Sequence, residues 1–332
     1  MTIPARLHFC WIGPSLPWAY AFAVLSAAAR AGLDEVVLHH TDALADDAPV
    51  RALRAAAGVR LSRADPPRLL DGCGRALGLG GGLARLYGRL GDAAQRSDVL
   101  RAAILHRDGG IYLDLDTLTV ASLRPLLAAR QFVGTERIVW PQRARESRSP
   151  ALLARHGALD LARKAMRRLP GGWRAFRHVE GGFPCAVNNA AMGAEAGAPL
   201  LEACLRAMAA VPDARLAQRT ALGPALLQAV VAGGAAEGLV VHAPRVFSPL
   251  PPEVSEHWFR AGRAAPRLDL ALCGETRAVH WYASVRTRAL VAAITPESVA
   301  ADRGRQLYSA LAAACVPGLA APRGPCAPGL RA

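Results

Sequence analysis

The sequence is almost free of lysine. Lys164 is the only lysine among 40 basic residues, and 26 acidic residues leave a net charge of +14 over 332 residues. Such a bias toward arginine, in a chain rich in alanine, is the expected signature of GC-rich coding, and we favour this explanation. Attraction to an anionic membrane, to nucleic acid or to a phosphate-bearing substrate is the functional alternative. Aromatic residues make up only 5% and do not interleave with arginine runs. This pattern argues against binding of single-stranded nucleic acid.

Cysteine is present, but not in the pattern of a disulfide framework or a structural zinc site. The number of cysteines is odd, no two of them form a C-x-x-C pair, and none lies near paired histidines. They are Cys10, Cys73, Cys185, Cys204, Cys273, Cys315 and Cys326. This usage favours a reducing compartment.

Long hydrophobic runs are also absent. The most apolar segment, 221–235, is interrupted by glycine, proline and glutamine, and no run reaches the length of a membrane span. Residues 1–13 lack the basic head and long apolar stretch of a secretory signal. We therefore expect a cytoplasmic protein, with peripheral attachment to the inner face of the membrane as an alternative.

What the chain does contain is a globular composition, 52% hydrophobic and 20% charged, which excludes collagen-like, coiled-coil and wholly disordered proteins. Strands and helices alternate at its start, which predicts an α/β fold on a mostly parallel sheet. The predicted strands are 6–12, 36–40, 59–61, 111–117, 185–190, 239–242 and 278–282. The predicted helices are 18–31, 48–57, 92–107, 150–169, 198–210 and 223–232.

Two segments fall outside this pattern. Residues 71–88 are rich in glycine but contain no phosphate-binding motif, so we predict a mobile loop there, with a lid as the functional alternative. From residue 294 the chain is rich in proline, glycine and alanine. We expect one domain over 1–293 and a tail over 294–332 that is partly helical, with a helix at 305–314, or disordered.

The strand at 111–117 runs directly into two carboxylates, Asp114 and Asp116. Side chains two apart on an extended backbone share a face, about 6.5 Å apart. Two such like charges repel, and a hard divalent cation such as Mg²⁺ or Mn²⁺ would relieve the repulsion. Taken alone, the pair is equally consistent with solvated aspartates at the end of a strand.

The helix before this strand carries Asp98 and Arg101, which share a face. An ordinary i, i+3 ion pair worth about 0.2–0.5 kcal/mol would also explain them. The joint string is more specific: Ser97–Arg101 reads SDVLR, and 109–116 reads GGIYLDLD.

This combination resembles the sugar-binding region of glycosyltransferase family 32 and related strings in the glucosylating domains of large clostridial toxins. The strand ending in Trp11-Ile12-Gly13, the Asn188-Asn189-Ala190 segment, and His280 with Ser284 after it are also similar to the family. The resemblance implies a GT-A-like fold, with a Rossmann-like nucleotide-binding half and a single mixed, mostly parallel sheet flanked by helices. It implies a nucleotide-sugar donor and Mn²⁺ or Mg²⁺ as cofactor.

The resemblance also implies roles for particular residues. The residues implied to act in catalysis are Asp98, Arg101, Asp114 and Asp116. The implied donor contacts are Trp11 against the base, Ile12, Gly13, Asp98, Arg101, Tyr112, Asp114, Asn188, Asn189 and Ser284. The implied metal ligands are Asp116, His280 and Asp114, the last directly or through water. Without the resemblance, His280 is equally a core histidine, and the two asparagines are equally turn residues.

The expected reaction is transfer of a hexose from a nucleotide diphosphate sugar, with UDP as the expected nucleotide, to a hydroxyl of a glycan or lipid-linked glycan. The resemblance implies retention of anomeric configuration. Two departures concern the acceptor side: Val285 follows Ser284 where the family often has tryptophan, and Leu222 replaces the threonine of a Thr-Gly-Pro motif. The basic helix 150–169 is a solvated face, or faces a phosphorylated acceptor or an anionic membrane.

Two other classes of function remain as alternatives. A haloacid-dehalogenase-type phosphatase also uses D-x-D after a strand, but a threonine or valine is expected where Leu118 stands, and the motif lies far from the N-terminus. A non-catalytic protein that binds anionic ligands or nucleic acid would rest on the charge alone. The joint presence of Asp98, Arg101, Asp114 and Asp116 argues against it.

Overall fold

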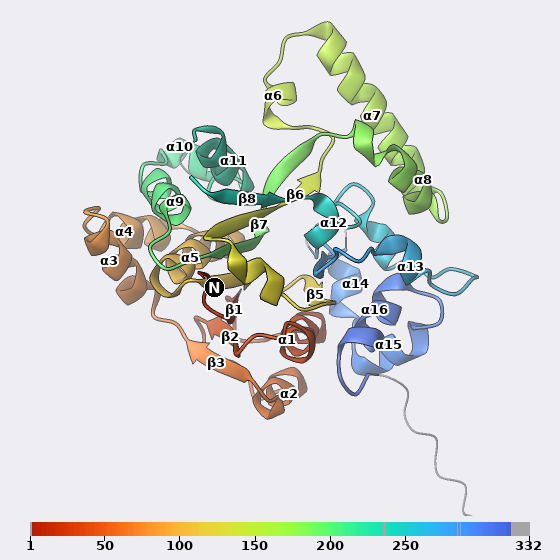
Figure 1. The fold of residues 1–332 in the computed structure, drawn as a ribbon, viewed down its shortest axis with the longest axis horizontal. Coiled ribbons are helices and arrows are strands. Elements are labelled where there is room, and N and C mark those ends of the chain that lie inside the picture. Colours follow the sequence, from red (N-terminus) through yellow and green to blue (C-terminus); the bar gives the residue numbers. More distant parts are fainter. Residues whose placement is uncertain (1, 235–236, 284, 286, 320–332) are drawn as a thin grey trace, which may run out of the picture.

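The computed structural model describes residues 2–234, 237–283, 285 and 287–319 (Figure 1). Its centre is a seven-stranded sheet in the order β3-β2-β1-β4-β7-β6-β8. Strand β7 is antiparallel to both neighbours and all other pairs are parallel. The strands are β1 (Arg6–Trp11), β2 (Glu35–His40), β3 (Val59–Arg63), β4 (Gly110–Leu113), β6 (Gln131–Arg137), β7 (Cys185–Ala194) and β8 (Leu239–His242). The predicted mixed, mostly parallel sheet flanked by helices is confirmed.

Helices cover both faces of this sheet. One face carries α1 (Trp18–Arg30) and α2 (Ala48–Ala55). The other carries α3 (Pro66–Ala76), α4 (Gly82–Arg89), α5 (Ala93–Asp108), α9 (Pro199–Ala209) and α11 (Pro224–Ala232). The alanines of α1 are small enough to bring this helix close to the sheet, and most of them are fully buried. Asp47 begins α2 by accepting a hydrogen bond from the Val50 amide, which the first turn of a helix otherwise leaves unpaired.

The prediction of a mobile loop over 71–88 is wrong, because this segment is largely helical. It contains most of α3 (Pro66–Ala76) and α4 (Gly82–Arg89), whose leucines are buried in the same hydrophobic cluster as residues of α5. The glycines have a packing reason: a Cβ on Gly74 would lie 2.2 Å from the carbonyl oxygen of Gly80. Glycine here allows two backbone segments to approach closely, and the sequence count alone suggested flexibility instead.

Helix α5 (Ala93–Asp108) leads into the predicted carboxylate motif. It ends at Gly109, and both Gly109 (φ 61°) and Gly110 (φ 107°) have the positive φ that favours glycine. A Cβ on Gly110 would lie 2.8 Å from the Arg6 carbonyl oxygen, so the turn can bring β4 against β1. The chain therefore reverses tightly, and β4 delivers Asp114 to the carboxyl edge of the parallel strands.

A second, two-stranded sheet lies beyond the motif. Strand β5 (Thr117–Thr119) pairs antiparallel with β9 (Ala278–His280), so Thr117 lies opposite His280. Around it pack α1 and the C-terminal helices α14 (Arg288–Ala292), α15 (Pro296–Asp302) and α16 (Leu307–Cys315). The observed α16 overlaps the predicted helix at 305–314. It is buried in the same cluster as Trp281, whereas the proposed domain boundary at 293 stays a prediction.

The remaining helices lie along the C-terminal half and on a projection from β6 and β7. The projection carries α6 (Gln142–Arg145), α7 (Pro150–Arg168) and α8 (Gly172–Val179) and stands away from the sheet at the top of Figure 1. The others are α9 (Pro199–Ala209), α10 (Asp213–Leu216), α11 (Pro224–Ala232), α12 (Pro244–Phe247) and α13 (Leu268–Ala271). Among the described residues, no helix combines the length and apolar character needed to cross a membrane.

Candidate active site

A pocket of about 290 Å³ lies beyond the carboxyl ends of β1 and β4. Ligands of open α/β sheets bind at such edges, where the strand order reverses on either side of the first strand. Five predicted site residues line it, namely Trp11, Ile12, Arg101, Asp114 and Asp116, and Ser97 lies beside them. A larger cavity of about 810 Å³ lies between β3, α3 and the end of α5, and no predicted site residue lines it.

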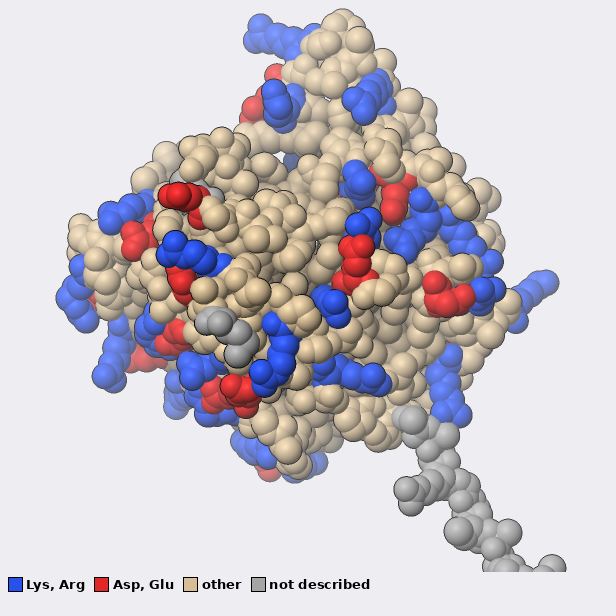
Figure 2. All heavy atoms as spheres, viewed as in Figure 1, with Lys and Arg blue, Asp and Glu red and all other residues tan. Residues whose placement is uncertain are grey.

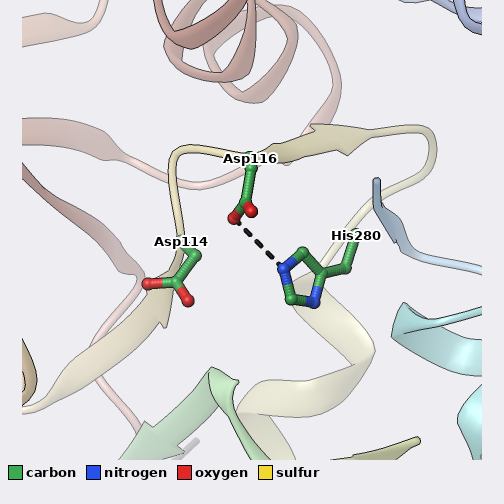
Figure 3. Close-up of side chains that lie close together, drawn as sticks. All are labelled: Asp114, Asp116 and His280. Carbon is green, nitrogen blue, oxygen red and sulfur yellow. Dashed lines mark ion pairs between the residues drawn. The ribbon is translucent and has the colours of Figure 1, made fainter. Parts of the chain in front are cut away.

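Asp114 and Asp116, which line this pocket, converge with His280 (Figure 3). One possible ligand atom from each lies within 4.8 Å of the others. Asp116 Oδ1 lies 3.1 Å from His280 Nε2, and Asp116 Oδ2 accepts a hydrogen bond of 2.8 Å from the Ala283 amide. The pairing of β5 with β9 brings His280 beside Asp116. A hydrogen bond of 2.9 Å from the Trp281 amide to the Asp116 carbonyl oxygen extends this pairing by one residue.

The charges of this group depend on one another. Burial opposes ionisation of both partners, but the His280 charge lowers the pKa of Asp116, and the Asp116 charge raises the pKa of His280. The group thus stabilises a positive charge beside Asp116. Two carboxylate oxygens and one imidazole nitrogen at this spacing are a donor set that suits Mn²⁺ or Mg²⁺. A buried Asp-Asp-His group that can hold a metal ion is therefore present.

A second charged network joins α5 to the same site. Arg101 Nη2 lies 3.1 Å from Asp98 Oδ1 and 3.0 Å from Asp114 Oδ1. The Asn189 side-chain amide donates to Asp98 Oδ1 at 2.7 Å, and Arg101 Nη1 donates to the Asn189 carbonyl at 2.5 Å. The network links three chain segments, and the side chains of Asp98 and Arg101 are 8% and 7% exposed. This burial and the additional partners exclude the simple surface i, i+3 pair.

Burial has a cost in this network. Burial raises the pKa of Asp98 to about 6, although Arg101 opposes the shift. Burial also opposes the charge of Arg101, but the carboxylates of Asp114 and Asp98 outweigh it and raise the pKa of the guanidinium. A Cβ on Gly223 would lie 2.6 Å from Asp98 Oδ2, so the Leu222-Gly223-Pro224 turn closes over this carboxylate. Gly223, which follows the departure from the family pattern at Leu222, thus lies against Asp98.

Tyr112 contacts both Arg101 and Asp114 of this network. Its side chain is buried, and the Arg101 guanidinium lies 4.7 Å from the centre of its ring. The Tyr112 hydroxyl donates to Asp114 Oδ1 at 3.1 Å and lies 3.3 Å from the Ser97 hydroxyl. Both Arg101 and Tyr112 contact Oδ1 of Asp114, so neither contact involves Oδ2. The structure places Tyr112 behind Asp114 and Arg101.

The aromatic wall of the pocket comes from β1 and α1. Trp11 lies against Tyr20, with ring centres 5.0 Å apart, and Tyr20 stacks on Trp281 at 6.0 Å. Ile12 also lines the pocket. Gly13 is outside the lining. Its amide donates to Asp42 Oδ2 at 2.9 Å, and its φ of 127° favours glycine, so it shapes the loop that follows β1.

The two asparagines separate in their contacts. Asn189 joins Asp98, as described, whereas Asn188 accepts a hydrogen bond of 2.5 Å from the Ala190 amide and also hydrogen-bonds Glu136. Asn188 therefore combines the local turn contact expected of asparagine with a contact to a buried carboxyl. Ser284 lies outside the described residues.

Sequence reasoning missed Glu136 and Tyr282. The Tyr282 hydroxyl donates to Glu136 Oε2 at 2.8 Å, and the Tyr282 ring stacks on His280 with ring centres 3.8 Å apart. Burial raises the pKa of Glu136, although the His280 charge and its hydrogen bonds oppose this. Tyr282 has a φ of 60°, the sole positive φ among the described residues other than glycine. This strained backbone was the signal, and no sequence pattern carries it.

Comparisons with known proteins agree with the geometry at the motif. Residues 82–133 match the family model described as a glycosyltransferase sugar-binding region containing a DXD motif. This segment holds α5, β4 and both aspartates of the motif. The match confirms the prediction of a glycosyltransferase. No curated protein matches the chain in sequence.

Solved structures similar to the chain are also glycosyltransferases. Mouse xyloside xylosyltransferase 1 is 14% identical with a TM-score of 0.42, and the match covers 83% of this chain and 96% of that one. The galactosyltransferase LgtC, in complex with donor and acceptor sugar analogues, is 15% identical with a TM-score of 0.36, covering 83% and 86%. The UDP-bound glycosyltransferase domain of the YGT toxin is 12% identical with a TM-score of 0.40, covering 73% and 79%.

Proposed function

We propose that this glycosyltransferase is metal-dependent and transfers a hexose from a nucleotide diphosphate sugar, with UDP as the nucleotide, to a glycan or lipid-linked glycan. One observation carries the proposal. The Asp114–Asp116–His280 group and the Asp98–Arg101 network share Asp114 and meet at one pocket. A site for a cation and polar groups that bind a sugar are thus adjacent, as transfer from a sugar diphosphate requires.

The network fixes the groups that would bind the sugar. Arg101 is held by two carboxylates and by the Asn189 carbonyl, so its guanidinium is oriented before a ligand arrives. The family resemblance implies that Asp98 accepts hydrogen bonds from donor hydroxyls, but its buried carboxylate contacts Arg101 and Asn189 and does not line the pocket, so we assign it the orientation of Arg101. The Trp11 and Tyr20 wall offers an aromatic surface for the nucleotide base.

Asp114, Asp116 and His280 would hold the divalent ion. When bound, such an ion neutralises the charge that develops on the leaving diphosphate and acts as a Lewis acid. The chain itself holds Asp116 in place through the Ala283 amide and His280 through the ring of Tyr282. These contacts keep the donor atoms together without requiring rearrangement of the strands.

The remaining parts of the proposal concern the acceptor and the stereochemistry. We expect retention, with the acceptor hydroxyl attacking on the face from which the diphosphate departs. The family resemblance supports this expectation. A phosphatase is less well supported, because Asp114, which would be its nucleophile, is held at Oδ1 by Arg101 and Tyr112.

The test is a thermal-shift screen of nucleotide sugars with and without Mn²⁺. Ligand that binds only the native state raises the melting temperature by mass action. We expect the largest metal-dependent shift with a UDP-sugar. The Asp116→Asn variant should stay folded but lose this shift. An Asp34→Asn variant, which removes an exposed carboxylate paired with Arg124, is the control and should keep it.

Two results would contradict the proposal. An unchanged metal-dependent shift in Asp116→Asn would remove Asp116 from the metal site. Hydrolysis of generic phosphate esters without any shift by nucleotide sugars would favour the phosphatase. The anomeric configuration of the product, measured by NMR from a donor of known configuration, decides between retention and inversion.

A further inference from the structure

The projection over residues 141–182, called the arm here, carries half of the protein's net charge. It contains ten basic and three acidic residues, a net charge of +7 against +14 for the whole chain. Its helices α6 and α7 stand away from the sheet in Figure 1. Figure 2 shows basic side chains around the tip of this projection. A codon bias would spread arginine along the chain, so this concentration of charge calls for a separate explanation.

The charged residues of α7 that face the body already have partners. Arg163 donates to Glu253 Oε2 at 2.8 Å and also pairs with Asp160. Arg167 lies 3.5 Å from Glu256. The buried His156 contacts the Val139 carbonyl oxygen at 2.6 Å. These contacts fix α7 to the body along one side, and the opposite side is therefore presented to solvent.

That opposite side is apolar. Its residues recur at helical spacing and all are exposed: Ala154, Ala158, Leu161, Ala165 and Leu169. Leu161 is 69% exposed and Leu169 is 57% exposed. A helix on a protein surface normally turns its apolar side inward and its charged side outward. Helix α7 does turn Leu159 and Met166 toward the core, but it carries this second apolar stripe on its outward side, which indicates a surface that another molecule or a lipid phase covers.

Arginines surround this apolar stripe. By the 3.6-residue period of the helix, Arg155 lies on one flank of the stripe and Arg168 on the other. Six exposed arginines of the arm make no ion pair with any residue that the structure describes: Arg143, Arg145, Arg148, Arg155, Arg168 and Arg174. An apolar protein partner would need few of these charges. An anionic bilayer complements both features, because leucines enter the acyl boundary while guanidinium groups bind lipid phosphates.

We propose that the arm docks the protein onto an anionic phospholipid surface through the outward side of α7. The arm is joined to the active site by β6 and β7, which carry Glu136 and Asn188. Docking would therefore hold the site near the lipid surface. The docking itself does not depend on the proposed function. The idea that docking brings the site to a lipid-linked acceptor does rest on the proposed function.

The test is flotation of the full chain with two kinds of vesicle, phosphatidylcholine alone and phosphatidylcholine with phosphatidylglycerol. We expect binding to the anionic vesicles only, and weaker binding as salt is raised. Each arginine near an anionic surface contributes about 1 kcal/mol, or about fivefold in partition coefficient. The Arg155→Glu/Arg168→Glu variant should thus lose about 25-fold or more. Leu161→Asp/Leu169→Asp should also lose binding, since it places charge in the apolar stripe.

A matched control carries the same charge change elsewhere. Arg68 and Arg75 are exposed on α3, which lies at the left of Figure 1, away from the arm at the top. Arg68→Glu/Arg75→Glu should keep most of the binding. Equal losses in the two arginine variants would show attraction by net charge alone and overturn the proposal. The proposal would also be overturned if the wild-type protein did not bind anionic vesicles. It would be overturned as well if the wild-type protein sedimented as a dimer and the Leu161→Asp/Leu169→Asp variant as a monomer. The metal-dependent shift with UDP-sugar should persist in every variant, which separates this test from that of the proposed function.

Discussion

Replacing Asp98 with asparagine should make the free energy of unfolding less dependent on pH. It should also impair donor binding. Burial raises the pKa of Asp98 from 3.8 to about 6, so the folded state holds a proton that the unfolded state has released. Stability from this group is therefore full below pH 3.8 and is lost as pH rises through 6. The difference of about two pKa units corresponds to about 3 kcal/mol. The Asp98→Asn variant has a neutral amide at this position, which does not titrate.

The assay is denaturant unfolding of both proteins, without metal or nucleotide, at several values between about pH 4 and pH 7. Relative to wild type, Asp98→Asn should gain free energy of unfolding across this range, by up to about 3 kcal/mol. The asparagine oxygen can still accept from Asn189, so the hydrogen bond at 2.7 Å need not be lost. Asp34→Asn, at an exposed position, should show no such gain. A difference that does not change with pH would refute the raised pKa of the buried Asp98 carboxyl.

The other predictions concern positioning and packing. Tyr282→Phe should lower the free energy of unfolding by about 1–2 kcal/mol, because the buried Glu136 carboxyl loses a hydrogen-bond donor. The variant should keep most of the metal-dependent thermal shift, because the ring still stacks on His280. Loss of the whole shift would show that the hydroxyl itself is needed. Gly193→Ala should cost about 1–3 kcal/mol in chemical denaturation, because its Cβ would lie 2.1 Å from the Phe132 ring. Gly157→Ala, inside α7 with open space around its Cβ, should instead raise the free energy of unfolding by up to about 1 kcal/mol.

The parts of the fold that were predictable from sequence are those with local signals. Strand β1 and helix α5 have long apolar patterns, and Gly109-Gly110 marks the turn between α5 and β4. Residues 71–88 failed because glycine count was taken as flexibility. The close approach of Gly74 to Gly80 shows that glycine there serves packing instead. Spacing along the chain cannot separate these two uses of glycine.

The candidate site divides in the same way. Asp98, Arg101 and the two motif aspartates lie within a short stretch, so their spacing already indicated a shared site. Glu136 gave no signal, because it lies on β6, which was not predicted, and reaches the site only through Tyr282 and Asn188. Its contribution depends on the sheet order, in which β6 and β7 pair with a shift in register beside Gly134. Such a contact exists only once the sheet has formed.

His280 shows why the two sequence interpretations of this residue are compatible. As a core histidine it should be buried, and it is 7% exposed. As a metal ligand it should face the motif, and Nε2 lies 3.1 Å from Asp116. The antiparallel register of β9 against β5 produces both results at once. Burial also removes competing water, so the pairing with Asp116 is strong enough to raise the pKa of the imidazole against the cost of desolvation. The same low dielectric would strengthen the attraction of these groups for a divalent ion, so burial of this histidine favours its proposed role.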